Sequence, residues 1–134
     1  MSCGINVHVE VKIKNSWHHL STPFIRSDYQ LFSIMAGVRG DEEPIVKPKG
    51  LPRDVTNLTL KHFNSKICDW HHASWFNYDE IKELKSILDK TNGLMNSIFM
   101  DSFGYVFGYS ITSDETLKDY FDIDDVRFVF WFDN

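Results

Sequence analysis

Apolar and polar residues alternate strictly over residues 5–14, and this is the clearest pattern in the chain. Every odd position from Ile5 to Ile13 is β-branched and apolar, and every even position is polar. Successive side chains of a strand point to opposite faces, so the alternation predicts a strand with one apolar and one polar face. The pattern is typical of an antiparallel strand whose polar face lies in water.

A second strong strand is predicted at residues 126–132, which are β-branched or aromatic except for Arg127. A strand that is apolar on both faces is usually covered on both sides and is therefore central in its sheet. We expect this strand to pair with strand 5–14 in one antiparallel sheet. The predicted core contains Val7, Val9, Val11, Leu84, Leu88, Phe128 and Phe130.

Capping residues predict two helices between these strands. The segment Asn77–Glu80 has the pattern of a capping box, and the helix over 78–90 that follows turns its positions 81, 84 and 88 toward the sheet. A shorter helix is predicted over 29–36, with Asp28 or the serine before it as the cap and Gly37 at the end.

The remaining patterns complete one α+β domain over residues 1–134, an antiparallel sheet with helices packed on one side. A tight turn returns the chain as a strand over 17–20, where His18 and His19 are expected in solvent. Three of the four prolines fall in 38–57, which predicts a long loop of a kind that often carries function. Weaker patterns indicate a strand at 105–111 and a short helix ending near residue 121.

The composition narrows the possible functions. The chain has 134 residues, the size of one domain, and a net charge of −5, which disfavours binding to duplex nucleic acid. It has two cysteines and begins directly with a strand pattern in place of a secretion signal, so we expect a cytoplasmic protein with reduced thiols. No apolar stretch approaches the length of a membrane span.

The segment Cys68–Trp75 is the richest in reactive side chains. Its thiol, carboxylate and two imidazoles are of the types that bind zinc, but adjacent histidines tend to diverge and no C-x-x-C or H-x-x-x-H spacing occurs. We therefore predict no resident metal and no cofactor. The alternatives are packing by the two tryptophans of the segment, a pocket lined by a histidine with Ser74, and a metal-assisted hydrolase that uses Asp69, His71 and His72.

Three arginines stand beside glycine, proline or aspartate in predicted turns. A guanidinium is a planar fork of donors that suits phosphate or carboxylate oxygens, so we hypothesise that they meet the 72–75 segment in one pocket. The hypothetical ligand-binding residues are Arg26, Arg39, Arg53, His72, Ser74 and Trp75. The arginines would contact phosphate-like oxygens and the tryptophan would stack on a flat ring; the alternative is that the arginines form ordinary surface ion pairs. The lack of a Walker loop or G-x-G-x-x-G motif argues against an ordinary NTP or dinucleotide enzyme.

Several short patches are shared with one known group of proteins. They are Met1–Ile5 with the strand that contains His8, Arg26–Tyr29, Met35–Arg39, Gly50–Asp54, His72–Trp75 and Asp125–Asn134. Together they resemble a family of small bacteriophage and prophage proteins whose function is not established. Where that family commonly has Asp-Ile-His, this chain has Gly4, Ile5 and Asn6. The resemblance implies a phage-linked protein that acts inside a bacterial host cell.

The sequence thus predicts a phage-type, non-enzymatic intracellular protein that binds an anionic, nucleotide-like small molecule or a host factor. Two alternatives stay open. One is the metal-assisted hydrolase through Asp69, His71 and His72, and the other is a protein–protein inhibitor that acts through the loop at 38–57. Neither duplex nucleic acid nor a membrane is expected as a partner.

Overall fold

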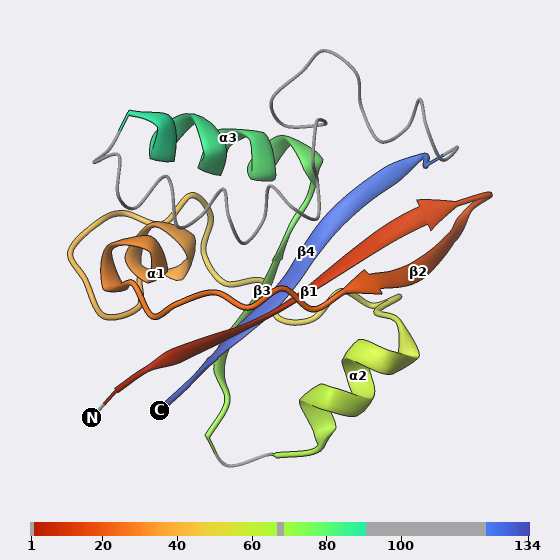
Figure 1. The fold of residues 1–134 in the computed structure, drawn as a ribbon, viewed down its shortest axis with the longest axis horizontal. Coiled ribbons are helices and arrows are strands. Elements are labelled where there is room, and N and C mark those ends of the chain that lie inside the picture. Colours follow the sequence, from red (N-terminus) through yellow and green to blue (C-terminus); the bar gives the residue numbers. More distant parts are fainter. Residues whose placement is uncertain (1, 67–68, 91–122) are drawn as a thin grey trace.

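A computed structural model describes residues 2–66, 69–90 and 123–134 (Figure 1). The described elements are β1 (Gly4–Ile13), β2 (Ser16–Ser21), α1 (Tyr29–Ala36), α2 (Asn57–Asn64), β3 (His71–Phe76), α3 (Tyr78–Asp89) and β4 (Asp125–Asp133). The strand predicted at 105–111 and the helix predicted to end near residue 121 lie outside the described residues.

The four described strands form one antiparallel sheet in the order β2-β1-β4-β3 (Figure 1). The pairing of β1 with β4 extends from Gly4 opposite Asp133 to Lys12 opposite Asp125, so the predicted neighbours are confirmed. Residues 126–132 are buried, as expected for a strand that lies between two others and is covered on both faces.

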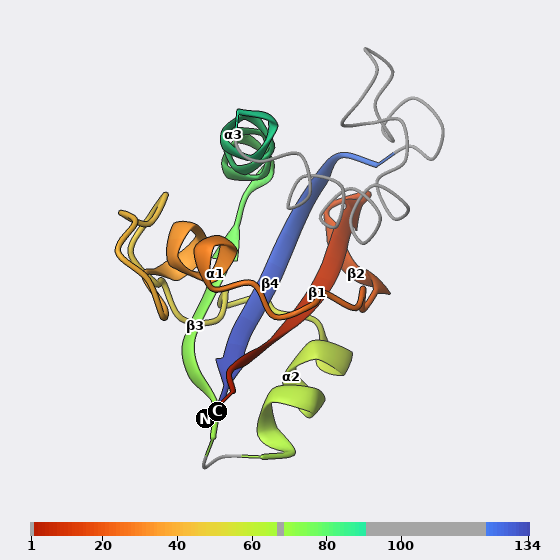
Figure 2. The same ribbon diagram turned by 60° about the vertical axis from the view of Figure 1, so that its left-hand side comes forward.

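The apolar face of the sheet carries the core. The register places Val7 opposite Phe130 and Val9 opposite Phe128, so the odd positions of β1 share a face with the even positions of β4. Helix α3 covers this face with its fully buried side chains at positions 81, 84 and 88, and α1 lies on the same side (Figure 2). The predicted α+β class, the packing of α3 and all seven predicted core residues are confirmed.

Both predicted helix starts are confirmed by their caps. The Asp28 side chain accepts a hydrogen bond from the Leu31 N–H, and Gly37 ends α1 in the left-handed conformation with φ of 72°. At α3 the Asn77 side chain accepts from the Glu80 N–H, and the Glu80 carboxylate accepts from the Asn77 N–H. Each cap satisfies backbone donors that the first turn of a helix leaves free.

Replacing Asn77 by alanine is expected to lower the free energy of unfolding by about 1 kcal/mol, because one capping acceptor of α3 is lost. Asn77→Asp keeps an acceptor at the same position and is expected to stay within a few tenths of a kcal/mol of the parent. Urea unfolding followed by circular dichroism measures both. Equal losses in the two variants would mean that the capping oxygen does not stabilise the helix.

The polar face of β1 is not in water at its centre, where this part of the prediction is wrong. His8 is 1% exposed and Glu10 is 0% exposed. The cover is α2, which lies on the opposite side of the sheet from α1 and α3 (Figure 2). The sequence does not predict α2 from an apolar stripe, because the side chains that face the sheet are polar. Thr59 is its fully buried residue, and His62 is the side chain that reaches His8. Helices therefore cover both faces of the sheet and are not confined to one side.

Most of the proline-rich segment 38–57 is a loop, as predicted, although α2 begins at Asn57; the loop is tied to the domain along its length. The Ile45 N–H donates to the Ile34 carbonyl, and the Gly50 N–H donates to the Ala73 carbonyl at the edge of β3. Pro52 is buried. These contacts make the loop a packed covering of the sheet edge.

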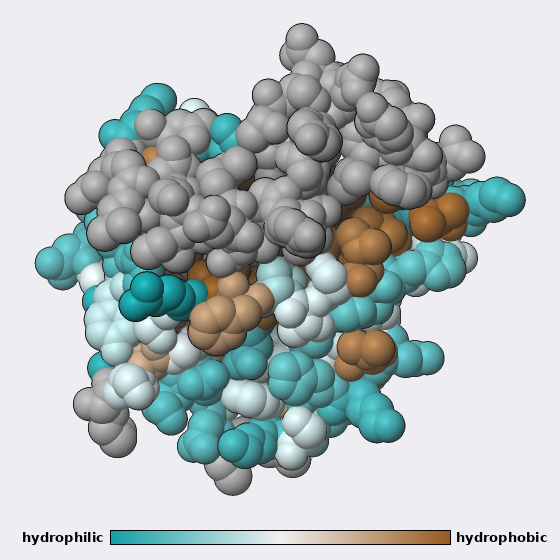
Figure 3. Space-filling model, in the orientation of Figure 1, coloured by the Kyte–Doolittle hydropathy of each residue, from teal (hydrophilic) through white to brown (hydrophobic). Residues whose placement is uncertain are grey.

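The surface is mostly hydrophilic in the view of Figure 3, with small, scattered apolar areas on the part of the chain that the structure describes. Among the described residues, the exposed large apolar side chains are Leu20, Phe24, Tyr29, Leu58 and Leu60. Single apolar residues of this kind are normal on a protein surface. None of the helices within the described ranges is both long enough and apolar enough to cross a membrane.

Candidate functional site

A buried ion pair joins the middle of the sheet to the 38–57 loop. The Arg127 guanidinium binds Glu10 through Nε at 2.8 Å and Nη2 at 2.7 Å, and it binds the Asp54 carboxylate through Nη1 at 2.6 Å. The Trp17 ring lies 3.8 Å from the guanidinium carbon. Arg127 Nη2 also donates to the Asp54 carbonyl at 3.0 Å.

The second oxygen of Glu10 is also fully engaged. It accepts hydrogen bonds from the N–H and hydroxyl of Thr56 and from the hydroxyl of Thr59. Burial by itself raises the pKa of Glu10, but the hydrogen bonds from the two threonines and Arg127 outweigh it and hold the pKa below its ordinary value. Because both oxygens are occupied, Glu10 is suited to anchor α2 and not to accept a substrate proton.

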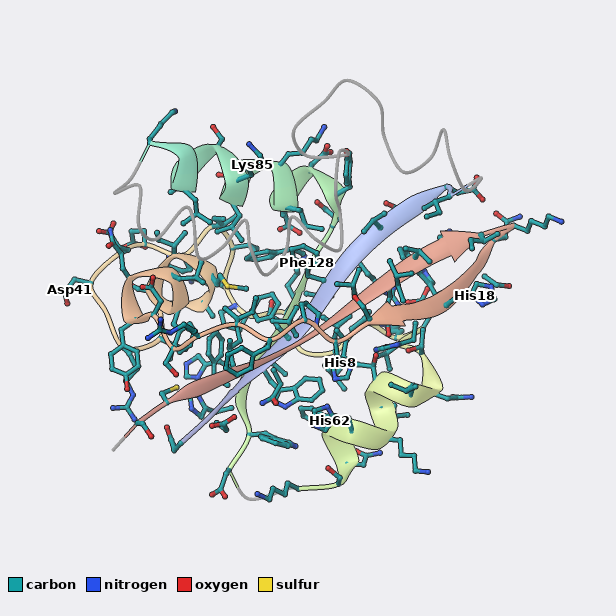
Figure 4. All side chains as sticks on the ribbon, in the orientation of Figure 1. His8, His18, Asp41, His62, Lys85 and Phe128 are labelled. Carbon is teal, nitrogen blue, oxygen red and sulfur yellow. The ribbon has the colours of Figure 1, made fainter. Side chains whose placement is uncertain are left out.

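Three histidines form a hydrogen-bonded chain on the same face of the sheet. His8 Nδ1 lies 2.9 Å from His19 Nε2, and His8 Nε2 lies 2.7 Å from His62 Nδ1. The Thr22 hydroxyl is 3.3 Å from both His8 Nδ1 and His19 Nε2. Figure 4 shows His8 and His62 together between the sheet and α2, whereas His18 lies apart from them. His18 is exposed as predicted, but His19 is half-buried and bonded to His8, which corrects the expectation for this residue.

Aromatic rings enclose this histidine chain. The Trp131 ring stacks on His8 with 5.2 Å between centroids and also contacts His62. The Trp70 indole donates to the Phe63 carbonyl at 2.8 Å and closes the C-terminal end of α2. Burial, with smaller contributions from the charges of His19 and His62, lowers the pKa of His8 to about 4. His8 is therefore neutral at pH 7.

A second polar cluster lies at the surface, where β3 and β4 meet the loop after α1. Asn134 Oδ1 lies 3.2 Å from Arg39 Nη2 and 3.2 Å from His71 Nε2. The Nδ1 atoms of His71 and His72 are 2.8 Å apart. Since His71 Nε2 faces an acceptor, it carries the hydrogen, and His72 Nδ1 donates to His71 Nδ1. We call Arg39, His71, His72 and Asn134 the edge cluster.

The shape of β3 explains why two adjacent histidines meet here. The register with β4 shifts between His71 and Ser74, so that two β3 residues face one residue of β4. This is a β-bulge, and His72 within it has φ of 55°, in the left-handed region. A regular strand would turn the two imidazoles to opposite faces. The expectation that they diverge is therefore wrong, because the bulge turns one side chain toward the other.

The structure brings only some of the predicted ligand-binding residues together. Arg39 and His72 both belong to the edge cluster. Ser74 is buried and its hydroxyl accepts from the Lys49 N–H, while the Lys49 ammonium lies 3.7 Å from the centre of the Trp75 ring. Ser74 and Trp75 are thus linked to each other through the 38–57 loop and point to opposite faces of β3.

The remaining two arginines are not members of the edge cluster. Arg26 is exposed and precedes Ser27, whose hydroxyl donates to the Cys3 carbonyl near the start of β1. Arg53 is exposed beside Asp54, which is bound to Arg127. Positions 127 and 134 are seven residues apart on an extended chain, or roughly 23 Å. Arg53 therefore lies far from the edge cluster, and a ligand role for each of the three arginines stays a prediction.

The comparisons with known proteins found no relatives. No family model, no curated protein and no solved structure matches the chain. The candidate site is therefore judged from its own geometry.

The segment proposed for a metal has a different arrangement. Asp69 is exposed, and His71 and His72 contact each other. Within residues 2–66, 69–90 and 123–134, no three His, Cys, Asp or Glu side chains are placed to hold a metal ion together. Cys68 lies outside the described residues, and Cys3 is a free, buried thiol whose pKa is raised by burial.

Sequence reasoning missed His8, His62 and Asn134. The regular alternation of residues 5–14 predicts His8 on a face exposed to water. His62 lies on a helix that has no apolar periodicity to reveal it. The one available signal was the pairing of the strand 5–14 with its hairpin, which places His19 next to Glu10 and so close to His8.

Proposed function

We propose that this protein is a non-enzymatic binding protein for a small anionic molecule that carries a phosphate or carboxylate group, and that the edge cluster is its site. The observation that carries the proposal is the position of Asn134 Oδ1. This single oxygen faces a guanidinium N–H from the loop after α1 and an imidazole N–H from β3. Two donors from separate elements thus already point at one acceptor.

The chemistry of the donors favours an anion over this amide oxygen. Both contacts are long, at 3.2 Å, as weak hydrogen bonds to a neutral acceptor are. A phosphate or carboxylate oxygen in the same position would make shorter, charge-assisted bonds to Arg39. The net charge of −5 gives no general attraction for anions, so binding would depend on this local group.

Backbone conformation supports the same site. Four described residues other than glycine have positive φ, and two of them, Lys14 and Asn15, form the β1–β2 turn, where this is expected. The other two are Arg39, with φ of 61°, and His72, with φ of 55°. Such conformations cost about 1–3 kcal/mol each and tend to collect at functional sites. Here both belong to residues of the edge cluster.

Neighbouring groups suggest what else a ligand would meet. The exposed Tyr29 ring lies 5.8 Å from the Arg39 guanidinium carbon, and its hydroxyl accepts from the Cys3 N–H. In a ligand whose phosphate group is bound by Arg39, a flat ring next to the phosphate could contact the Tyr29 ring. We therefore infer a nucleotide-like ligand, in a phage-type protein that acts inside a bacterial cell, as the resemblance of the sequence implies.

Arg39→Ala is expected to weaken binding of a nucleoside monophosphate about tenfold or more, because a charge-assisted hydrogen bond contributes about 1.5–3 kcal/mol. Isothermal titration calorimetry with adenosine monophosphate and with inorganic phosphate measures the change. Lys12→Ala removes a cation at the opposite end of the β1–β4 ladder from Asn134 and serves as the matched control, with binding expected within twofold of the parent.

Asn134→Ala gives the sharpest test, because its expected effect has the opposite sign. It removes the internal oxygen that competes with the ligand, so binding should become roughly threefold to tenfold tighter, in line with about 0.5–1.5 kcal/mol for a neutral hydrogen bond. Weaker binding in Asn134→Ala, or equal binding in Arg39→Ala and Lys12→Ala, would rule out the edge cluster as the anion site.

A further inference from the structure

The chain of His8, His19 and His62 joins three elements on the face of the sheet that α2 covers. It is separate from the exposed edge cluster. His8 belongs to β1, His19 to β2 and His62 to α2, and both ring nitrogens of His8 are in contact with another imidazole. We propose that this chain is a pH-responsive latch, which holds the C-terminal half of α2 on the sheet while the imidazoles are neutral and releases it when they take up protons.

The number of protons on the three imidazoles determines whether both hydrogen bonds of the histidine chain can form. Each of its two contacts needs one hydrogen between two ring nitrogens. Three neutral imidazoles satisfy both contacts, and so do three imidazoles of which one is a cation. With two cations, one contact must have two N–H groups facing each other across 2.7–2.9 Å. The chain therefore tolerates one added proton at most, and the second breaks a contact.

The surroundings of His8 disfavour even the first proton. Its ring is buried against Trp131 of β4, which is uncharged, and the other polar group in contact with it is the Thr22 hydroxyl. The charged residue nearest on its own strand is Glu10, whose carboxylate is bound by Arg127. Burial and the charges of His19 and His62 accordingly lower the pKa of His8 to about 4, far below the ordinary value near 6.5.

The sign of the effect follows from this shift. A histidine that binds its proton less readily in the closed state stabilises that state at pH values above 6.5, and the stabilisation is lost as the pH falls from 6.5 toward 4. Burial also lowers the pKa of His19, which adds to the effect in the same direction.

Helix α2 is the part that gives way. His8 and His19 lie on strands that are paired along their length, whereas His62 reaches the chain from a helix held by side chains. The first turn of α2 stays anchored, because Thr59 binds Glu10 and the pKa of Glu10 is held below its ordinary value. The last turn is bound at its backbone by the uncharged Trp70 indole, and among the described residues it has no such bond to a charged group. Opening it brings water to Trp131, whose indole N–H is buried without a partner among the described residues.

Hydrogen–deuterium exchange of the full chain between pH 8 and pH 4.5, corrected for the intrinsic pH dependence of exchange, tests the proposal. We expect protection in residues 60–64 to fall steeply below pH 6 while the peptides of β1 and β4 stay protected. If opening admits two protons, the opening constant rises on the order of 100-fold per pH unit, against tenfold for one proton.

His62→Gln keeps a hydrogen-bonding side chain that cannot take up a proton, so opening should admit fewer protons and the opening constant of α2 should rise about tenfold per pH unit in place of 100-fold. The pH dependence that remains comes from His8, which stays buried in the closed state. His18→Gln changes the exposed neighbour in β2 and should behave like the parent; His19→Gln tests the same point if the His62 variant does not fold. The proposal fails if α2 stays protected until the whole chain unfolds, or if His62→Gln or His19→Gln opens with the steepness of the parent.

Discussion

Arg127→Met is expected to lower the free energy of unfolding by about 3–5 kcal/mol, which is a large part of the stability of a typical domain. The substitution keeps the apolar length of the side chain and removes the charge that compensates Glu10. Glu10 would then be a buried carboxylate with only the donors of Thr56 and Thr59 for compensation. Chemical denaturation in urea at pH 7 measures the loss.

The double variant Glu10→Gln/Arg127→Met separates the lost charge from lost packing. The amide keeps an oxygen for the threonine donors but carries no charge, so we expect it to recover a substantial part of the loss. Lys82→Met is the matched surface control, because Lys82 pairs with Asp79 in solvent; it should cost less than about 1 kcal/mol. A loss in Arg127→Met as small as that of Lys82→Met would show that Glu10 is hydrated.

Phe130→Ala is expected to cost about 3–5 kcal/mol, because it opens a cavity in the centre of the core. Phe130 is 0% exposed, and its ring packs edge-on against Phe76 and Phe132 with centroids 4.9 Å and 5.9 Å apart. The rings around Phe130 come from both β3 and β4, so the loss of Phe130 should weaken the packing between these two strands. The midpoint of urea unfolding, at unchanged slope, reports the change.

Phe24→Ala deletes the same side chain at a position that is 80% exposed, which makes it the control for Phe130→Ala. Its cost should stay within about 0.5 kcal/mol, as for ordinary surface substitutions. Similar costs for the two variants would mean either that Phe130 is not in a packed core or that Phe24 is covered in solution.

Local signals were enough to predict the caps and the apolar side of the sheet. Asp28, Gly37 and the Asn77–Glu80 box act within one or two turns of the chain, and they determine where α1 and α3 begin or end without help from distant residues. The alternation in β1 likewise reports burial of its odd positions, because a strand exposes or buries every second side chain together.

The candidate sites depended on contacts that no local pattern encodes. Glu10 and Arg127 are 117 positions apart and meet only because β1 and β4 are neighbours. The two adjacent histidines of β3 meet because a bulge turns His72, and the bulge is a feature of how β3 pairs with β4. In the sequence, these charged residues and histidines cannot be told from ordinary surface residues.

The sequence by itself determined the α+β class, the pairing of the first and last strands and the apolar core. A face that is buried is apolar at regular intervals along the chain, and this periodicity is the strongest signal of structure in a sequence. Only the tertiary structure decided that the polar face of β1 is covered. The covering helix α2 is held by a hydrogen bond that Thr59 donates to Glu10 and by one that His62 shares with His8. Polar side chains of this kind look the same in sequence whether they face water or each other. Whether these side chains are buried depends on partners that are distant in the sequence and meet only in the folded protein.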